Sequence, residues 1–519
     1  MTLTQWFIFF LIVQVVHFAG TWKLYEAAGH KRWEAAVPIY NAIVLMKIIN
    51  RPTWWTILLF VPVVNLIMFP VVWVETLRSF GKNSTADTLL GIFTFGFYIY
   101  YVNYTQPLNH IPDRDLRANS KIGDTISSFL FAIVVATIVH TYIMQPFQIP
   151  TSSLEKSLLV GDFLFVSKFH YGARTPSTTV ALPMVHDTIP VINKRSYLFK
   201  PQLPSFRFPG VQKIEKNDIV VFNWPVDTVV RFFDASTPRV DKPIDKKSNY
   251  VKRCVGTPGD SLSIVDGDVH INGKKLIMPE RARPQTQYFV TFDGKTPIDF
   301  EHVLSSLDIT DGAGFISERR DTLLISAMTE RGAEALRKVP GIVSVTKGID
   351  KKGQGPTVVF PKGYTNWTVD NYGPLYIPEE GKTVALNRQS LPFYKKIIAE
   401  FEGHDLKVNG DEIRIDGKVA KSYTFAQNYY WMMGDNRHRS EDSRYWGFVP
   451  ENHVVGKPVL IWMSLDANKK GFGKIRWERM FTTVGGEGEP VSYFKFFLIA
   501  LGLYFVASYF IKKRKAAQE

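Results

Sequence analysis

The sequence predicts a multi-pass membrane protein with a mainly β domain outside the membrane and an inserted α/β subdomain within that domain. Three observations predict this fold class. Apolar residues gather into long blocks, the region between the last two blocks consists of short β-type runs, and one strand–helix–strand pattern interrupts those runs. The mean hydropathy of −0.04 therefore averages two different kinds of sequence.

Composition limits the classes of protein that remain. Of the 519 residues, 45% are hydrophobic and 14% aromatic, which excludes a disordered chain because such a chain buries too little apolar surface to offset its entropy. The net charge of +14 suits nucleic acid, an anionic membrane surface or an acidic partner, and does not choose among them. A single cysteine, Cys254, excludes an intrachain disulfide and a thiolate zinc site.

Five apolar blocks are candidates for membrane helices. They cover residues 3–19, 54–74, 89–104, 122–144 and 493–511. A spanning helix needs about 20 apolar residues, and the fourth and fifth blocks meet this length best. Because no basic residue precedes the first block, we expect a retained helix there rather than a cleaved signal peptide. Residues 36–49 are interrupted by polar residues and predict a helix at the membrane surface.

Basic residues predict the orientation of the chain in the membrane. Residues 512–515 are all basic and place the C-terminus in the cytoplasm, and the basic residues of 114–121 place the loop before the fourth block there too. The long region between the fourth and fifth blocks then lies outside. Arg78 and Lys82 fit this scheme poorly if residues 54–104 form a spanning hairpin, because they then lie on the outer side.

The region between the last two blocks predicts mostly β structure, since its apolar runs are short, β-branched or alternating and are separated by Gly, Pro, Asn and Asp. Within it, a strand over 322–328, a helix over 331–338 and a strand over 342–346 predict the α/β subdomain. The runs predicted as strands are 163–167, 218–223, 249–255, 261–271, 357–360 and 411–415.

These features divide the chain into seven parts. They are an N-terminal membrane region of about three helices and an interfacial segment (1–121), a transmembrane anchor (122–146), a first part of a catalytic core (147–275) with an insertion at 172–211, an inserted subdomain (276–423) that includes 322–346, a second part of the core (424–490), a C-terminal transmembrane helix (493–511) and a basic cytoplasmic tail (512–519).

A search for nucleophiles and bases singles out a serine and a lysine. The histidines outside the membrane lie in no recognisable triad or metal-binding motif. Lysine can replace histidine as the base if burial lowers its pKa. Lys252 lies in a strand-like run in which Arg253 points to the opposite face, so an inward Lys252 would be held in an apolar wall. Cys254 shares that face and is expected to be a small buried hydrophobic residue.

A competing pattern pairs Ser153 with Lys156. The string Ser153-Leu154-Glu155-Lys156 has the S-x-x-K spacing of penicillin-binding proteins and β-lactamases, in which the two side chains lie one helical turn apart. The S-D-N and K-T-G strings that complete that signature are missing, and the residues that follow lead into a strand rather than a long helix. The pattern alone therefore favours neither Lys156 nor Lys252 decisively.

Four segments together resemble the bacterial type I signal peptidases, or leader peptidases, which are membrane-anchored serine endopeptidases with a Ser/Lys dyad. The segments begin at Gln148, Gly161, Tyr250 and Met433, and the resemblance covers residues 147–168, 216–260 and 429–462 in the same order along the chain. The last segment is the most specific, because it combines Gly-Asp-Asn-Arg, Ser-Glu-Asp-Ser-Arg and Gly-Phe-Val-Pro.

The resemblance implies a role for each matching residue. Ser153 matches the nucleophile and Lys252 the general base, while the hydroxyl of Thr151 and the backbone N–H of Ser153 match the oxyanion hole. Ser440 matches the serine that orients the lysine. The residues that match site-shaping positions are Gly434, Asp435, Arg253, Asp442 and Arg444, with Asp435–Arg253 and Asp442–Arg444 as ion pairs, and those that match substrate-binding positions are Phe147, Gln148, Ile149, Pro150, Tyr250 and Val251.

The resemblance also implies the substrate and the setting. We expect cleavage of signal peptides from exported preproteins after small residues of the Ala-x-Ala type, through an acyl-enzyme, with neither a cofactor nor a metal. The expected location is the bacterial inner membrane, with the catalytic domain on the periplasmic side and a cytoplasmic C-terminus. Membrane lipid and the secretion translocon are further expected partners, and nucleic acid is not one. A catalytically silent scaffold remains the alternative of a different class.

The sequence departs from the family pattern directly after the nucleophile. The family usually has Met-x-Pro-Thr-Leu there, and this chain has Leu154-Glu155-Lys156-Ser157-Leu158. The charges of Glu155 and Lys156 are expected to alter the preference for residues after the cut. His438 and Arg439 replace a more usual Asp-Asn before Ser440.

Overall fold

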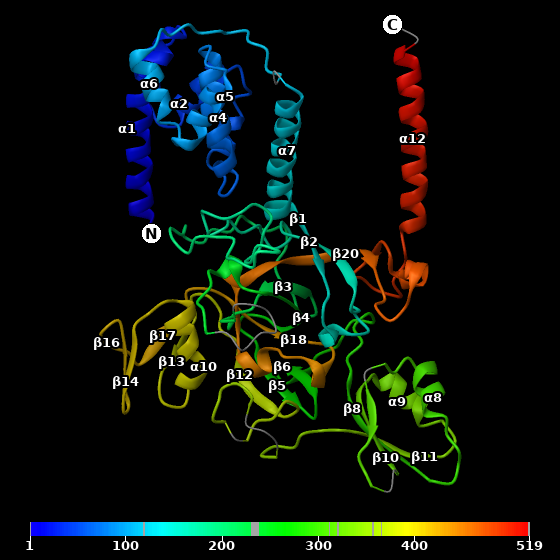
Figure 1. Ribbon diagram of the computed structural model, residues 1–519. Coiled ribbons are helices and arrows are strands. Elements are labelled where there is room, and N and C mark those ends of the chain that lie inside the picture. The colour runs from blue at the N-terminus through cyan, green and yellow to red at the C-terminus, as the bar shows by residue number, and fades with distance from the viewer. Residues whose placement is uncertain are drawn as a thin grey trace. The chain divides into compact units, whose positions relative to one another are not determined.

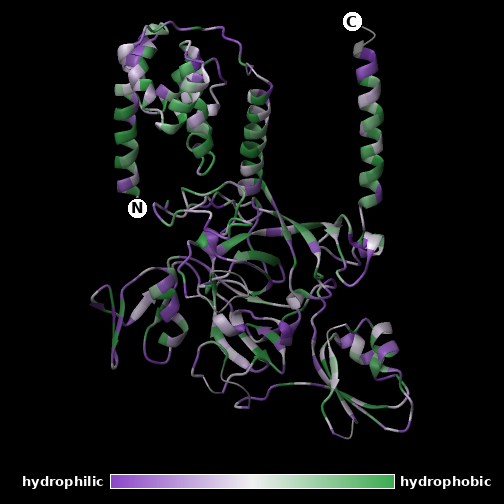
Figure 2. Cartoon of the chain, in the orientation of Figure 1, coloured by the Kyte–Doolittle hydropathy of each residue, from purple (hydrophilic) through white to green (hydrophobic). Residues whose placement is uncertain are grey.

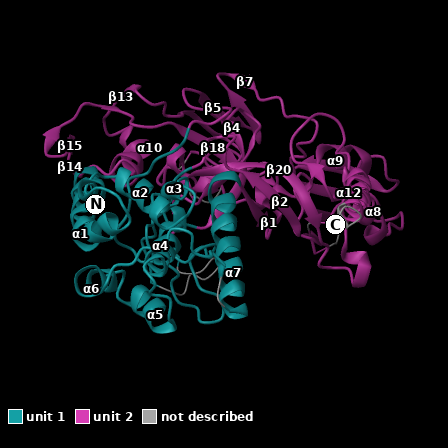
Figure 3. Cartoon of the chain, turned by 90° about the horizontal axis from the view of Figure 1, so that it is seen from above, with its two compact units in different colours: residues 1–143, 174–208, 228–247 teal, residues 144–173, 209–227, 248–519 magenta. Residues whose placement is uncertain are grey.

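The fold is given by a computed structural model, in which residues 2–117, 120–229, 238–310, 312–318, 321–354, 358–364 and 366–516 are described (Figure 1). The chain divides into two compact units (Figure 3). Unit 1 comprises residues 1–143, 174–208 and 228–247, and unit 2 comprises residues 144–173, 209–227 and 248–519. Residue 357 of a predicted strand and residues 517–519 of the predicted tail lie outside the described residues.

Unit 1 consists mainly of helices. Its first helix, α1, begins after a capping box in which Oγ1 of Thr2 accepts a hydrogen bond from the backbone of Gln5. Oγ of Ser120 caps α7 in the same way by accepting from the backbone of Gly123. The helices of unit 1 are α1 (Leu3–Ala27), η1 (Arg32–Ala35), α2 (Tyr40–Ile48), α3 (Trp55–Leu58), α4 (Asn65–Ser79), α5 (Thr85–Phe93), α6 (Tyr98–Thr105), α7 (Lys121–Ile138) and η2 (Val139–Ile143).

Three helices of the described residues are long and apolar enough to cross a membrane. They cover Leu3–Ala27, Lys121–Ile143 and Phe494–Arg514, and the hydropathy colours of Figure 2 mark these helices as largely hydrophobic. The structure differs from the predicted spanning hairpin over residues 54–104, which instead forms the shorter helices α3 to α6. The reason is local, because Val63 and Phe95 adopt left-handed backbone conformations that end the apolar runs in turns.

Two segments that interrupt the sequence of unit 2 belong to unit 1. One is residues 174–208, which lies within the insertion predicted at 172–211. The other, residues 228–247, was not predicted as an insertion. The indole of Trp6 donates a hydrogen bond to the carbonyl of Gln202, and Val63 packs with Ala181 and Tyr197, so residues 174–208 contact the helical part of unit 1.

An antiparallel sheet of eight strands forms the centre of unit 2. Its strands follow the order β1-β2-β20-β3-β4-β18-β19, and β21 pairs with β20. Along β3 the side chains alternate, so that Val220 and Val221 belong to core clusters on opposite faces of the sheet. The strands are β1 (Met144–Gln148), β2 (Asp162–Ser167), β3 (Ile219–Asn223), β4 (Asn249–Gly256), β18 (Tyr429–Met433), β19 (Val449–Pro450), β20 (Val454–Ser464) and β21 (Thr482–Thr483).

Three smaller sheets pack around this one. The run predicted over 261–271 is a hairpin of β5 and β6, because Asp266 and Gly267 both adopt left-handed conformations between them. The described residues of the run predicted over 357–360 form no strand. The sheets are β12-β5-β6-β7, β13-β17 and β14-β15-β16, built from β5 (Ser261–Val265), β6 (Asp268–Ile271), β7 (Lys274–Lys275), β12 (Tyr372–Tyr376), β13 (Thr383–Ala385), β14 (Leu406–Asn409), β15 (Glu412–Ile415), β16 (Lys418–Val419) and β17 (Ser422–Thr424); α10 (Leu391–Lys396) lies between β13 and β14 in the chain.

Residues 286–347 form a separate sheet with two helices. The predicted strand, helix and strand correspond to β10, α9 and β11, but β10 and β11 are not neighbours, because β8 pairs between them. The element order β-α-β-β-α-β with the strand order β11-β8-β10-β9 is a split βαβ arrangement. The elements are β8 (Thr286–Phe292), α8 (Phe300–Ser306), β9 (Ala313–Phe315), β10 (Thr322–Met328), α9 (Glu330–Leu336) and β11 (Ile342–Lys347).

We predict that Leu164→Ala destabilises unit 2 by about 2–5 kcal/mol, because Leu164 of β2 is fully buried and its truncation leaves a cavity. Thermal unfolding of the full chain in detergent measures the change. The control is Val265→Ala, since Val265 is largely exposed and its truncation should cost less than about 0.5 kcal/mol. Equal effects of the two substitutions would contradict the assignment of Leu164 to the core.

Candidate active site

The loop after β1 brings Ser153 to the side chain of Lys252. Ser153 lies in the short helix η3 (Ser152–Leu154), and Lys252 lies on β4. Nζ of Lys252 is 2.5 Å from Oγ of Ser153, and the two residues are only 3% and 7% exposed. A hydroxyl and an amine at hydrogen-bond distance in a buried site are the pairing of nucleophile and base that serine chemistry needs.

Burial gives Lys252 the proton affinity of a base that works near neutral pH. Loss of solvent lowers the pKa of its amine to about 8. The negative charges of Asp442 and Glu441 act in the opposite direction and keep the pKa from falling further. The amine is therefore neutral in a substantial fraction of molecules at mildly alkaline pH, whereas an exposed lysine has a pKa of about 10.4.

Cys254 lies two residues further along β4, on the same face as Lys252. It is completely buried among apolar side chains, including Val220 and Met432. Burial raises the pKa of its thiol, so the thiolate form is disfavoured. The structure thus gives Cys254 the environment of a small core residue.

Two buried ion pairs between arginine and aspartate lie next to Lys252. Arg253 donates from Nε and Nη2 to the two carboxylate oxygens of Asp435, at 2.8 and 2.6 Å. Arg444 donates from Nε and Nη2 to Asp442, at 2.9 and 2.8 Å. Although burial raises the pKa of each carboxyl group, the adjacent guanidinium group lowers it below its usual value. Both carboxylates are consequently charged and already paired with arginine beside Lys252.

Gly434 lies where three parts of the site converge. A Cβ atom at this position would clash with Oγ of Ser440 and would lie 2.5 Å from the carbonyl oxygen of Ser153. The position therefore requires glycine for close approach rather than for its backbone angles. Oγ of Ser440 is buried and has no hydrogen-bond partner among the described residues, so the expected bond to Lys252 is not present in this arrangement.

The predicted substrate-binding residues border the edges of two strands, β1 and β4. β1 is the terminal strand of the sheet and pairs only with β2 among the described strands. On the β18 side of β4, the register with β18 covers Arg253 to Gly256 and ends at Arg253, directly after Lys252. Of the predicted residues along these edges, Phe147, Ile149 and Val251 share one apolar cluster. Tyr250 is half-buried, with its ring 5.4 Å from Nζ of Lys252. Gln148 and Pro150 are exposed, and Thr151 is half-buried directly before η3.

Comparison with known protein families decides the family of this chain. The signal peptidase family, peptidase S26, matches residues 122–321 and 380–463, which is more than half of the chain and includes Ser153 and Lys252. The chain belongs to the signal peptidase family S26. A second family, described only as a family of unknown function (DUF5684), matches residues 33–111 within unit 1.

Curated members of the signal peptidase family show the same relationship. The chain is 25% identical to Signal peptidase I of Haemophilus influenzae over 376 residues, which cover 70% of this chain and 76% of that protein. It is 25% identical to Signal peptidase I of Helicobacter pylori over 381 residues, 69% of this chain and 92% of that protein. It is 25% identical to Signal peptidase I of Buchnera aphidicola subsp. Schizaphis graminum over 342 residues, 66% of this chain and 75% of that protein.

Lys156 of this signal peptidase family member has a different set of partners from Lys252. Its Nζ lies 2.9 Å from Oδ1 of Asp308 and 3.2 Å from Oγ1 of Thr310. Its backbone is left-handed, so residues 153–156 do not form the helical turn that an S-x-x-K pair needs. The geometry therefore favours Lys252 over Lys156 as the base for Ser153.

Sequence reasoning missed Gln285, which joins the nucleophile loop to the Asp435 loop. Gln285 is buried, and its backbone N–H donates to the carbonyl of Asp435 at 2.8 Å while its own carbonyl accepts from Arg437 at 2.8 Å. Its Nε2 donates to the carbonyl of Glu155 at 3.1 Å. Gln285 lies in the predicted insertion, outside any motif, so no local signal could have revealed its role.

The side chain of His438 joins the same loop to two other segments. Its Nδ1 accepts from the backbone of Gln287 at 3.2 Å, and its Nε2 lies 3.1 Å from a carboxylate oxygen of Asp370. Burial raises the pKa of the Asp370 carboxyl, but the contact with His438, a backbone hydrogen bond from Asp350 and the charge of Arg444 together lower it overall. His438, a departure from the family pattern, thus connects β8 and the segment before β12 to the loop that follows β18.

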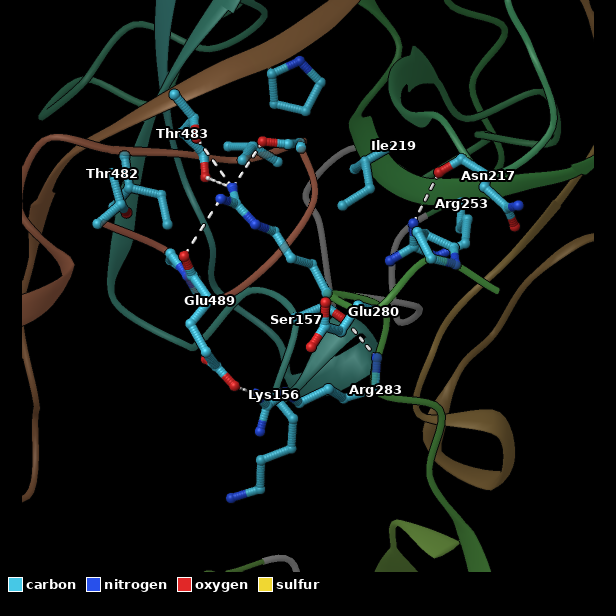
Figure 4. Close-up of a pocket in the computed structure, with 18 of the residues that line it drawn as sticks. Lys156, Ser157, Asn217, Ile219, Arg253, Glu280, Arg283, Thr482, Thr483 and Glu489 are labelled. Carbon is cyan, nitrogen blue, oxygen red and sulfur yellow. Dashed lines mark hydrogen bonds and ion pairs between the residues drawn. The ribbon is translucent and has the colours of Figure 1, made fainter. Parts of the chain in front are cut away.

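A cavity of about 550 Å³ lies on the Arg253 side of β4 (Figure 4). Neither Ser153 nor Lys252 lines it. Its positive side chains already have partners, since Arg283 pairs with Glu489, Lys457 with Asp218, and Arg281 donates to backbone carbonyls of residues 483–489. The cavity is therefore separate from the contact between Ser153 and Lys252.

We predict that Gln285→Ala lowers kcat about tenfold and leaves KM nearly unchanged. Loss of the amide leaves the buried carbonyl of Glu155 without its partner, a cost of about 1–3 kcal/mol that the nucleophile loop can relieve only by moving. Peptidase activity of the full chain in detergent, with kcat and KM measured separately, tests this. Gln389→Ala, at an exposed glutamine, is the control. A wild-type kcat in Gln285→Ala would contradict the positioning role.

Proposed function

We propose that this protein is a signal peptidase I that removes N-terminal signal peptides from exported preproteins by serine–lysine catalysis. The observation that carries the proposal is the 2.5 Å contact between Nζ of Lys252 and Oγ of Ser153 in a buried site where the lysine pKa is lowered. Membership of the S26 family and similarity to Signal peptidase I of several bacteria support the same activity.

In the proposed first step, the neutral amine of Lys252 takes the proton of the Ser153 hydroxyl as Oγ attacks the scissile carbonyl. The hydroxyl of Thr151 and the backbone N–H of Ser153 stabilise the oxyanion. The resulting Lys252 ammonium then donates its proton to the leaving amine, which is the new N-terminus of the mature protein. An acyl-enzyme remains, in which the signal peptide is esterified to Ser153.

In the second step, the same amine, neutral again, activates a water molecule that hydrolyses the ester. Each half of the reaction thus uses Lys252 first as a base and then as an acid. The ion pairs Arg253–Asp435 and Arg444–Asp442 support this cycle, because a carboxylate that already has a guanidinium partner holds the lysine ammonium less strongly.

We propose that the signal peptide binds as an extended strand between β1 and residues 249–252 of β4. The terminal position of β1 in the sheet and the end of the β4–β18 register at Arg253 support this mode, since main-chain hydrogen bonds to a strand edge bind peptides of varied sequence. The apolar cluster of Phe147, Ile149 and Val251 would contact the side chains before the cut. Shallow apolar contacts of this kind suit small residues and hence the Ala-x-Ala pattern.

We propose that three helices, α1, α7 and α12 (Phe494–Ala516), cross the bacterial inner membrane. With three crossings, a cytoplasmic C-terminus and an outer catalytic domain, residues 28–120 lie entirely on the cytoplasmic side. Arg78 and Lys82 then share that side with the basic residues of 114–121, which removes the conflict that a spanning hairpin created. Membrane lipid and the secretion translocon are the further partners in this proposal.

The domain plan of unit 2 is part of the same proposal. Residues 147–275 and 424–490 supply the catalytic core, and residues 276–423 are an insertion that contains an α/β subdomain at 286–347. The contacts of Gln285 and of His438 support a role for this insertion in holding the active-site loops, which is distinct from a catalytic role.

We predict that Ser153→Ala and Lys252→Ala each abolish cleavage of a preprotein by the purified full chain, because the first removes the nucleophile and the second the base. Lys156→Ala is the matched control and should retain most activity, since its amine pairs with Asp308. Cleavage that persists in Lys252→Ala but disappears in Lys156→Ala would establish the S-x-x-K alternative. Absence of cleavage by the wild type in membranes would favour a scaffold.

We predict that kcat/KM rises with pH up to about 8 and then levels off. Below the pKa of Lys252 each unit of falling pH reduces the neutral fraction about tenfold, and above it the amine is already neutral. Rates from pH 5 to 10, with protein stability checked at each pH, provide the measurement. A rate independent of pH between 6 and 8 is incompatible with Lys252 as the base.

A further inference from the structure

One carboxylate in unit 1 lies among three arginines. Glu75, near the end of α4, is only 5% exposed. Its Oε2 accepts from Nε of Arg51 at 2.8 Å and also contacts Nη2 of Arg114, while Nη1 of Arg78 lies 3.8 Å from Oε1. Nε of Arg114 donates to Oγ of Ser79 at 3.0 Å. We call Arg51, Glu75, Arg78 and Arg114 the arginine cluster.

The arginine cluster carries more positive charge than the protein compensates. Three guanidinium groups are always protonated, so with one carboxylate the formal charge is +2. Nε of Arg78 is buried and has no hydrogen-bond partner among the described residues. The side chains of Arg51 and Arg78 are 20% and 33% exposed, so part of the cluster remains accessible. Such a site has both the charge and the free donor capacity to bind an anion.

The surroundings of the cluster place that anion at a membrane surface. Three segments of the chain meet at this end of unit 1, where the backbone of Ile111 donates to the carbonyl of Ser79 and Lys82 donates to Gln106. The opposite end of α4, at Asn65, is about 15 Å from Glu75 by helix rise, and Phe60, five residues before Asn65 in the chain, has an exposed apolar side chain. Phe95, in the turn between α5 and α6, is likewise exposed. Exposed apolar side chains at one end of these helices and basic side chains at the other suit a segment that enters the bilayer from one side and returns to that side.

We propose that the arginine cluster binds the phosphodiester of an anionic phospholipid. Guanidinium groups bind phosphate through paired hydrogen bonds, and basic pockets between helices at the cytoplasmic face recognise anionic head groups. The site lies in the residues that match a family of unknown function and their immediate neighbours, and it gives this part of the chain a lipid-binding role. The proposal does not depend on peptidase chemistry, since none of the cluster residues belongs to unit 2.

The experiment compares lipids and variants of the full chain in detergent micelles. Added phosphatidylglycerol should raise the Tm of the wild type in a concentration-dependent way, and phosphatidylcholine should not, because a ligand that binds only the folded state stabilises it. Arg78→Gln should weaken the response to phosphatidylglycerol about tenfold in lipid concentration, which is the size expected for one charged hydrogen bond. The matched control is Arg32→Gln, because the Arg32 side chain is 62% exposed and pairs with Glu26 outside the cluster.

Several outcomes would overturn the proposal. Equal Tm responses to the two lipids, or an unchanged response in Arg78→Gln, would show that the cluster selects no anionic lipid. Inorganic phosphate that stabilises the wild type as strongly as phosphatidylglycerol would show a small-anion site instead. If Arg78→Gln does not fold, Arg78→Lys is the second variant. It keeps the charge but loses the paired donors of the guanidinium group, so it should weaken the response to phosphatidylglycerol, and an unchanged response in folded Arg78→Lys would overturn the proposal. Native mass spectrometry of the wild type in micelles counts the bound lipids. Equal numbers of bound phosphatidylglycerol and phosphatidylcholine molecules would also contradict the proposal.

Discussion

The exclusion of water from the Lys252 amine is the constraint on which the rest of unit 2 depends. Desolvation lowers the pKa of this amine to about 8, and its contact with Ser153 keeps it at the reacting hydroxyl. Carboxylates nearby would reverse that effect unless they were themselves neutralised. The pairing of Asp435 with Arg253 and of Asp442 with Arg444 therefore serves the lysine as well as the fold. Isolated buried charges of this kind would cost several kcal/mol each.

Residues far apart in the chain meet at this site because the sheet is antiparallel and mixes early and late strands. β20, from the end of the sequence, pairs between β2 and β3, and β18 pairs with β4. The nucleophile loop consequently lies against the Asp435 loop, where the backbone of Asn436 donates to the carbonyl of Ser153 at 3.1 Å. Gln285 and His438 extend the same support to residues 285–287. The residues between the two parts of the core thus also take part in shaping the site.

Unit 1 uses charge in the opposite way. In the active site each buried carboxylate has one arginine, whereas Glu75 has three arginines around it. In the active site, pairing of the carboxylates with arginine limits their stabilisation of the Lys252 ammonium, which favours the neutral amine. The arginine cluster instead retains positive charge at a partly exposed position. Part of the net charge of +14 belongs to this cluster and to the basic residues near it.

Local sequence was sufficient for the features that depend on periodicity or on a motif. It predicted the long helices at 122–144 and 493–511 and eight of the 21 strands that the described residues of unit 2 form, and a resemblance to the signal peptidases singled out Ser153 and Lys252, whose side chains lie in contact in the structure. It was insufficient for residues 54–104, where left-handed turns at Val63 and Phe95 shorten the helices, and for Ser440, whose hydroxyl does not contact the lysine. Left-handed turns at non-glycine residues leave little trace in hydropathy.

The sequence by itself determined which residues can react and which segments can enter a membrane, because both follow from side-chain chemistry and apolar length. The residue pattern alone did not choose between Lys252 and Lys156, and the resemblance to signal peptidases indicated Lys252. The tertiary structure agrees with that choice, because the amine of Lys252 is buried against Oγ of Ser153 and that of Lys156 pairs with Asp308. Only the tertiary structure decided the parts played by Gln285 and by the arginine cluster. Their roles arise from contacts between segments distant in sequence, and such contacts exist only once the chain has folded.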